Sequence, residues 1–188
     1  MNVLVINGSP NRNGNTLNIA NSILKGLETN NHFCKVIHLY DLKINNCLAC
    51  KNAASIHLKK DCTHSDDFTN ILLPEIRNAD LLIFATPVYM GHVTGIMKTM
   101  LDRWYTFILE NFKIRDLENK KFISVVTSGA PSIAFKNVSE YLKNWLGEGF
   151  FKMKNIAVIH EGDFVGESGK CDKIDLLEKY EAFGKTIT

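Results

Sequence analysis

Five short apolar runs recur along the chain, each bounded by turn residues and each with little alternation between apolar and polar positions. They lie at residues 3–6, 36–39, 81–85, 122–126 and 156–159. Runs of this kind, rich in Val and Ile, are typical of parallel strands that are buried on both faces. The pattern therefore predicts a five-stranded parallel sheet.

Helical periodicity fills the intervals between these runs, at residues 16–28, 66–77, 92–110 and 132–146, with a last polar helix at about 172–183. Pro74 should kink or break the second helix, because proline has no backbone N–H to donate. Strands that alternate with helices predict an α/β, doubly wound sheet. A flavodoxin-like order and half of a dinucleotide-binding fold both fit this pattern, and both place ligands beyond the carboxyl ends of the strands.

Composition and charge narrow the class of protein. The 188 residues are 45% hydrophobic and 22% charged, which fits a single globular domain, residues 1–188. A net charge of +2, with both signs interleaved, argues against a nucleic-acid partner. The first residues resemble neither a signal peptide nor a membrane span, so we expect a cytoplasmic protein with no membrane partner.

The first candidate site is the loop "GSPNRNGNT", which lies between the first strand and the first helix. It lacks the Lys of a Walker loop and the three glycines of a dinucleotide fingerprint. Its polar groups, on Ser9, Asn11, Asn13, Asn15 and Thr16, precede a helix N-terminus and suit a terminal monophosphate. The alternative is that Asn15 or Thr16 only caps the helix.

Two further loops would lie at the same edge of the sheet. The loop after the third strand offers an aromatic ring and a thioether to a flat ligand, and the loop after the fourth strand offers backbone donors. The alternative for the latter is a plain turn followed by a Ser132 N-cap. The candidate residues of the two loops are Pro87, Val88, Tyr89, Met90, Thr127, Ser128 and Gly129.

The segments "INGSPNRNGNT", "ADLLIFATPVYMGHVTGIMKTMLDR" and "VVTSG", in this order, resemble the NAD(P)H-dependent FMN reductase and iron–sulfur flavoprotein group of the flavodoxin-like superfamily. The resemblance covers about residues 1–159. It implies a flavodoxin-like three-layer α/β/α fold with strand order 2-1-3-4-5, and an FMN cofactor reduced by NADH or NADPH.

The same resemblance implies the roles of the candidate residues. The phosphate would be held by Ser9, Asn11, Asn15 and Thr16, the isoalloxazine flanked by the segment from Pro87 to Met90, and its other edge met by Thr127, Ser128 and Gly129. The group commonly has Arg where this chain has Asn11, and Arg12 is the candidate to supply that charge.

The resemblance also implies a homodimer or homotetramer. The aromatic segment "MLDRWYTFILENF", residues 100–112, is the candidate interface. The alternative is that Trp104, Tyr105 and Phe107 belong to the core. Asp102 and Arg103 are interpreted as structural.

The long connection at residues 40–65 carries Cys47, Cys50 and Cys62. In iron–sulfur members of the resembled group, four cysteines at about these positions hold a [4Fe–4S] cluster, and this chain has Ala53 where one of them is expected. The favoured interpretation is a structural or substrate-side loop with free thiols, or with a reversible Cys47–Cys50 disulfide, and no metal. The alternatives are a cluster completed by Cys34, Cys171, a histidine or another chain, and a zinc site with His57 or His64 as fourth ligand.

The function predicted from these features is an oxidoreductase that passes reducing equivalents through FMN to a small acceptor such as a quinone, nitro compound or flavin. No catalytic side chain is expected, since the chemistry belongs to the flavin, and Tyr89 would have a positional role. Two rivals remain, an FMN electron carrier that serves protein partners and an anion-binding module without flavin.

Overall fold

We describe residues 1–51, 56, 61–164 and 174–188 in a computed structural model of the chain. Five strands form one sheet in the order β2-β1-β3-β4-β5, and all neighbouring strands are parallel. This confirms the predicted flavodoxin-like fold. The strands are β1 (Asn2–Asn7), β2 (Phe33–His38), β3 (Leu81–Pro87), β4 (Lys121–Thr127) and β5 (Lys154–Glu161).

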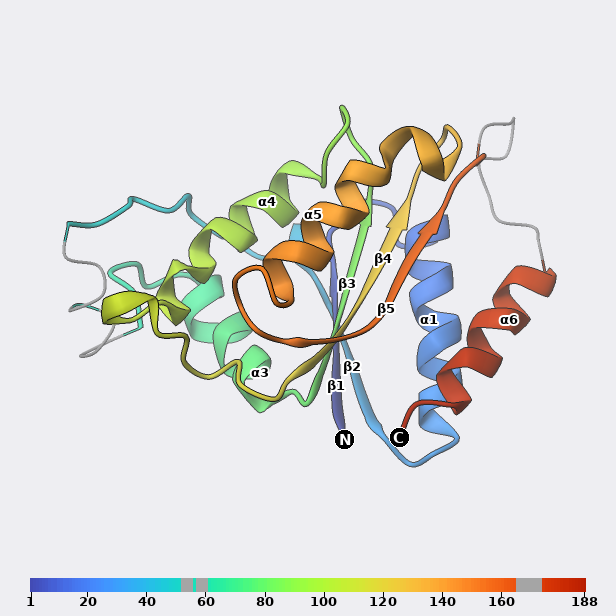
Figure 1. Ribbon diagram of the computed structural model, residues 1–188, viewed down its shortest axis with the longest axis horizontal. Coiled ribbons are helices and arrows are strands. Elements are labelled where there is room, and N and C mark those ends of the chain that lie inside the picture. Colours follow the sequence, from blue (N-terminus) through green and yellow to red (C-terminus); the bar gives the residue numbers. More distant parts are fainter. Residues whose placement is uncertain (52–55, 57–60, 165–173) are drawn as a thin grey trace.

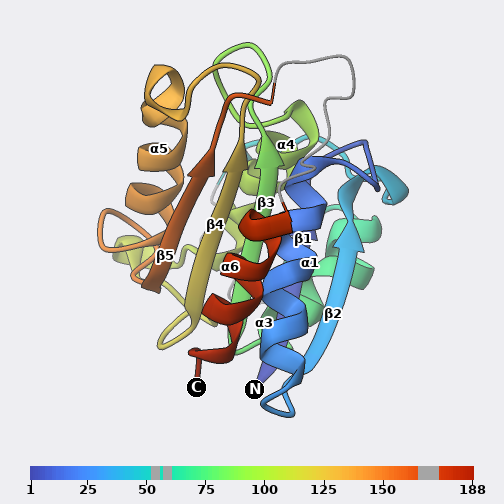
Figure 2. The ribbon, with the colours of Figure 1, turned by 90° about the vertical axis from the view of Figure 1, so that its right-hand side faces the viewer.

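Helices cover both faces of the sheet (Figure 1 and Figure 2). On one face lie α1 (Asn15–Glu28) and α6 (Ile174–Lys185), and on the other lie α3 (Leu73–Asn78), α4 (Gly95–Asp102) and α5 (Lys136–Leu146). In β1, Val3 and Val5 pack into the α1 side while Leu4 and Ile6 pack into the other core. Because both faces are covered, the central strands are apolar without alternation.

Helices α1 and α6 pack closely side by side, as Figure 2 shows. A Cβ added to Gly26 of α1 would lie 2.7 Å from the Cα of Gly184 in α6. No real Cβ atom tolerates that distance, so the pair of glycines permits the close approach. The predicted C-terminal helix is therefore packed against the sheet layer, as expected.

Three of the predicted helices, over 66–77, 92–110 and 132–146, have different bounds in the structure. The helix over 66–77 is a π-helical turn, Phe68–Leu72, followed by α3, and Pro74 stands at the start of α3 as the break requires. The helix over 92–110 was wrong at both ends: α4 begins only after Thr94, whose hydroxyl accepts a hydrogen bond from Met97 N, and a 3₁₀ segment, Arg103–Phe107, follows α4.

The alternative of a Ser132 N-cap was also wrong. A 3₁₀ turn, Ser132–Phe135, precedes α5, and the residue at the N-cap of α5 is Phe135, with no side-chain cap. Residue 39, assigned to the second strand from sequence, lies instead in the 3₁₀ turn Leu39–Asp41. Among the helices in the described part of the chain, none is long and apolar enough to cross a membrane.

Candidate functional site

The loop after β1 is shaped by its own side chains. Asn7 Oδ1 accepts a hydrogen bond from Ser9 N at 3.1 Å, and Asn11 Oδ1 accepts one from Asn13 N at 3.0 Å. Ser9 is 5% exposed and its hydroxyl accepts from Asn11 N at 3.2 Å. These short-range bonds let the loop hold its turns without a hydrophobic core of its own.

The N-terminus of α1 faces this loop without a side-chain cap. Gly14 occupies the N-cap in extended conformation, and no side-chain hydrogen bond caps the helix. Asn15 and Thr16 lie inside the helix and are buried, so the capping alternative was wrong. Backbone N–H groups and the helix dipole at such an end favour an anion.

Arg12 forms an ion pair with Asp41 in the turn that follows β2, and both side chains are about half exposed. Next to this pair, His38 Nδ1 lies 2.9 Å from Asn7 Nδ2, and since the amide must donate, the imidazole accepts as a neutral ring. Burial, and then the charge of Arg12, lower the pKa of His38, while Asp41 acts to raise it.

The loop after β3 is a tight turn. Tyr89 N donates to His92 O at 2.9 Å and His92 N to Tyr89 O at 3.1 Å. The two central residues, Met90 and Gly91, both have positive φ, 48° and 76°, as a type I′ turn requires. Glycine adopts this conformation freely, whereas Met90 is strained there, although its side chain is entirely exposed. Such strain at an exposed tip is typical of a functional position.

The loop after β4 is held by its neighbours. Ser128 N donates to Glu161 O at 3.0 Å, and Ser128 Oγ donates to Ala130 O at 2.8 Å. His160 Nε2 lies 3.3 Å from the same hydroxyl, and its Nδ1 lies 3.3 Å from the hydroxyl of Ser139. Thr127 and Ser128 are each 4% exposed, whereas Gly129 is exposed.

Hydrogen bonds join the three loops into one site at the carboxyl edge of the sheet. Gly8 N donates to Ala85 O at 2.8 Å, and Thr94 Oγ1 donates to Gly8 O at 2.8 Å. Val88 N donates to Thr127 O at 2.7 Å, and the hydroxyls of Thr16 and Thr127 lie 2.6 Å apart. The eleven residues predicted for the site therefore lie on these three loops or on the strand and helix ends that border them, Asn15 and Thr16 in α1, Pro87 in β3 and Thr127 in β4.

Sequence reasoning missed three residues that position these loops, namely Asn7, Thr94 and His160. Thr94 could have been found, because Thr directly before an apolar helical pattern is an N-cap signal. Asn7 and His160 lie at strand ends and carry no local signal. Burial lowers the pKa of His160, and Glu161 partly opposes this.

The segment at residues 100–112 divides between core and surface. Met100, Trp104 and Phe107 are fully buried, so the core alternative is confirmed for the last two. It was wrong for Tyr105, which is 45% exposed. Arg103 is structural as interpreted, with its guanidinium paired to Asp66 in the interior.

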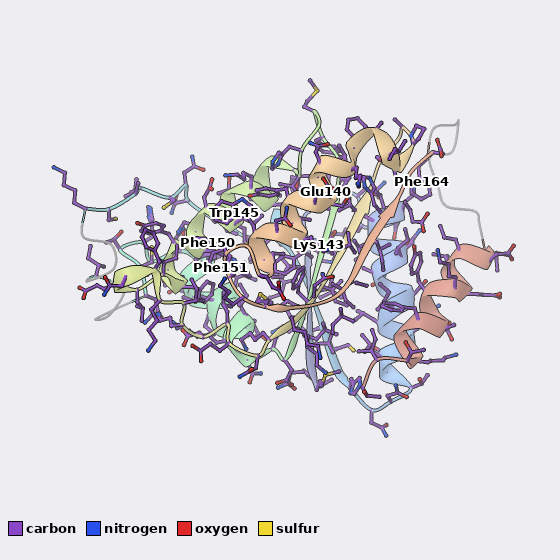
Figure 3. All side chains as sticks on the ribbon, viewed as in Figure 1. Glu140, Lys143, Trp145, Phe150, Phe151 and Phe164 are labelled. Carbon is purple, nitrogen blue, oxygen red and sulfur yellow. The ribbon has the colours of Figure 1, made fainter. Side chains whose placement is uncertain are left out.

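Aromatic side chains line a groove of about 450 Å³ beside this segment, and three of them, Tyr105, Phe112 and Trp145, are exposed. Its walls come from α4, the 3₁₀ segment after it, the end of α5 and the loop that follows; Trp145, Phe150 and Phe151 lie together there in Figure 3. The aromatic members of the lining are Tyr105, Phe112, Tyr141, Trp145, Phe150 and Phe151.

The described part of the cysteine loop, which is the connection at residues 40–65, does not provide the four thiolates that a cluster needs. Cys47, Cys50 and Cys62 line one small cavity, and all three are free thiols. Ala53, His57 and Cys171 lie outside the described residues. Of the two states considered for Cys47 and Cys50, the structure has the free thiols and not the disulfide.

Comparison with known proteins points to one family. A family model described as NADPH-dependent FMN reductase matches residues 1–163. An iron–sulfur flavoprotein of Archaeoglobus fulgidus is 38% identical over 129 residues, which cover 69% of this chain and 60% of that protein. Another from Methanocaldococcus jannaschii is 30% identical over 145 residues, which cover 75% of this chain and 70% of that protein. The chain thus spans about 60% of the length of the Archaeoglobus relative.

Solved structures share the fold at low sequence identity. An NAD(P)H:quinone oxidoreductase from Methanothermobacter marburgensis superposes with a TM-score of 0.76 at 19% identity, covering 98% of this chain and 96% of that one. An FMN-dependent NADH-azoreductase from Bacillus anthracis, in complex with FMN, has a TM-score of 0.67 at 13% identity, with the same coverage.

Proposed function

Since this chain belongs to the NADPH-dependent FMN reductase family, we propose that it takes reducing equivalents from NADH or NADPH and passes them, through bound FMN, to a small acceptor. The main support for this proposal is that three polar loops at the carboxyl edge of the sheet are hydrogen-bonded to one another. Ligands of doubly wound folds bind at this edge.

The phosphate of FMN would lie at the first loop, against Ser9, Asn11, Asn15 and Thr16. The uncapped N-terminus of α1 supports this placement, because its free dipole end favours a doubly charged group. Since Arg12 is paired with Asp41, the backbone N–H groups and the helix dipole supply the positive potential in its place.

The ring would lie between the second and third loops. Pro87, Val88, Tyr89 and Met90 would flank it, and Tyr89, which is 48% exposed, has the free surface that stacking needs. Thr127, Ser128 and Gly129 would meet its other edge. Because the hydroxyls of Thr127 and Ser128 and the backbone N–H of Ser128 are bonded within the protein, we assign the donor at this edge to the backbone of Gly129.

When bound, FMN supplies the redox chemistry, accepting hydride from the nicotinamide and delivering electrons to the acceptor. The residues of the chain orient the ring and shield one side of it. Nicotinamide and acceptor would use the same exposed space in turn, so we expect ping-pong kinetics. A quinone, nitro or azo compound, or a second flavin is the acceptor class, and the quinone and azo substrates named for the fold neighbours support it.

The test is a turnover assay with purified, FMN-loaded protein, NADH or NADPH, and a soluble quinone. Parallel lines in double-reciprocal plots are the expected result. If FMN binds but neither nucleotide supports turnover, the electron-carrier alternative replaces the proposal. A protein that does not bind FMN at all would support the anion-binding alternative.

We also propose a homodimer or homotetramer, with the aromatic groove as the contact. Phe112 is 75% exposed and Trp145 is 45% exposed, beside a cavity large enough to receive side chains of a second copy. Phe112→Asp should yield monomers in light scattering. Ile133→Asp is the matched control, because Ile133 is also 75% exposed but does not line the groove. A monomeric wild-type protein would contradict the proposal.

A further inference from the structure

The loop after β2 brings three sulfur atoms to one cavity. Cys47, Cys50 and Cys62 line it together with His64 and Arg103, and its volume is about 20 Å³. A cavity needs about 10–15 Å³ to hold a single water molecule, so this one has room for about one atom of that size.

Each of the three sulfurs already has its own protein partner. Arg103 Nη2 donates to Cys62 Sγ at 3.3 Å, and Ala49 N donates to Cys47 Sγ at 3.5 Å. Cys50 Sγ lies 3.4 Å from Thr63 Oγ1. Within the described ranges, no three His, Cys, Asp or Glu side chains are arranged to hold a metal ion. The sulfurs are thus accommodated as separate thiols.

The other described cysteine cannot complete the set. Cys34 lies on β2 and packs against the core on the α1 side of the sheet, whereas Trp104, next to Arg103 in sequence, packs in the opposite core. Burial, followed by the charge of Glu28, raises the pKa of the Cys34 thiol to about 11. A thiol that resists ionisation on the far face of the sheet is no ligand for this cavity.

The sequence relatives are named iron–sulfur flavoproteins, but this chain has too few cysteines in the loop to hold such a cluster. A [4Fe–4S] cluster is held by four thiolates, and the compact run in this chain has Cys47 and Cys50 at C-x-x-C spacing and then Ala53 in place of the next one. We infer that this chain is a member of the family without an iron–sulfur cluster, and that Ala53 is the reason.

This inference narrows the acceptor, and in that respect it rests on the proposed function. A cluster accepts and releases single electrons and would offer an exit at the cysteine loop. Without one, reducing equivalents leave only from the flavin, so the acceptor must enter the site formed by the three loops. A small two-electron acceptor such as a quinone meets that requirement, and a protein partner docked at the cysteine loop does not.

The test measures iron, acid-labile sulfide and FMN per chain after anaerobic reconstitution with ferrous iron and sulfide. The matched control is Cys50→Ser, which lacks one more thiol. We expect wild-type protein to hold no more iron and sulfide than this control. About four of each per chain above the control would overturn the inference. If Cys171→Ser then abolished them, Cys171 would be the fourth ligand.

Adding the missing cysteine tests whether Ala53 is the reason that the cluster is absent. Ala53→Cys should acquire about four iron and four sulfide, with a broad visible absorbance that bleaches on reduction, whereas Ala54→Cys, one position off the spacing, should not. If Ala53→Cys stays free of iron, the assignment of Ala53 is wrong. The FMN content of the same samples is independent: a chain without iron and without FMN contradicts the proposed function and leaves the cluster inference intact.

Discussion

Replacing Asp66 with Asn should destabilise the protein strongly, because Asp66 holds the buried Arg103. The two side chains are 5% and 1% exposed, and Arg103 Nη1 lies 2.7 Å from Asp66 Oδ2. Arg103 also donates to Asn45 O at 2.9 Å and to Cys62 Sγ at 3.3 Å, so this one guanidinium fastens both ends of the cysteine loop to the 3₁₀ segment after α4. Asp66→Asn leaves that cation without its counterion.

The expected loss follows from two estimates. Burial alone would raise the Asp66 pKa, but the hydrogen bond from Arg103 and that from Asn45 N outweigh it and lower the value from 3.8 to about 2. A shift of this size corresponds to about 2 kcal/mol. Removing one partner of a buried ion pair costs about 3–5 kcal/mol. We therefore expect the free energy of unfolding at pH 7 to fall by about 2–5 kcal/mol.

Urea denaturation followed by circular dichroism measures this loss. Asp102→Asn is the matched control: its pair with Lys98 is exposed, 49% and 43%, and should contribute less than about 0.5 kcal/mol. Because the folded pKa of Asp66 lies below 3.8, its stabilisation is present above pH 3.8 and is lost as the pH falls through about 2. The wild-type and variant curves should converge over that window. A loss of under 1 kcal/mol at pH 7 would refute the role assigned to the pair.

Three further changes test the candidate site. Asn11→Arg should tighten FMN binding in a fluorescence titration, since it adds a charge beside the proposed phosphate; unchanged or weaker affinity would count against that placement. Met90→Gly should relieve about 1–2 kcal/mol of strain at φ 48° yet weaken FMN binding; equal affinity would remove Met90 from the ring site. His160→Gln keeps a hydrogen-bonding group toward Ser128 and should retain FMN, whereas His160→Ala should not. Because partial burial lowers the His160 pKa below 6.5, wild-type stability should decline as the pH falls below 6.5, and less so in His160→Gln; identical pH profiles would argue against a neutral, half-buried imidazole.

The central strands were predictable because burial on both faces leaves no choice of residue type. Leu81, Leu82, Ile83 and Phe84 are all fully buried, so the apolar run itself marks β3. The positions of the loops followed from the parallel topology, since the carboxyl ends of such strands meet at one edge. The fold and the location of the candidate site could therefore be predicted from local patterns in the sequence.

Long-range polar contacts were not predictable in the same way. Arg103 and Asp66 are separated by 37 positions, and Ser128 and His160 by 32, so no window of sequence shows either pair. The start of α4 was misplaced for a related reason: the bonds between Tyr89 and His92 keep those residues in a turn, which the apolar periodicity through the region conceals. Neither kind of contact is visible in the local apolar periodicity of the sequence.

Anaerobic titration of the FMN-loaded chain with NADPH, and in parallel with NADH, tests the central claim most directly. We predict that one equivalent of at least one nucleotide bleaches the flavin band of each chain within the time of turnover, with no second chromophore consuming electrons. A flavin that neither nucleotide reduces, or that takes up reducing equivalents beyond its own two electrons, would contradict the proposal of a flavin-only reductase.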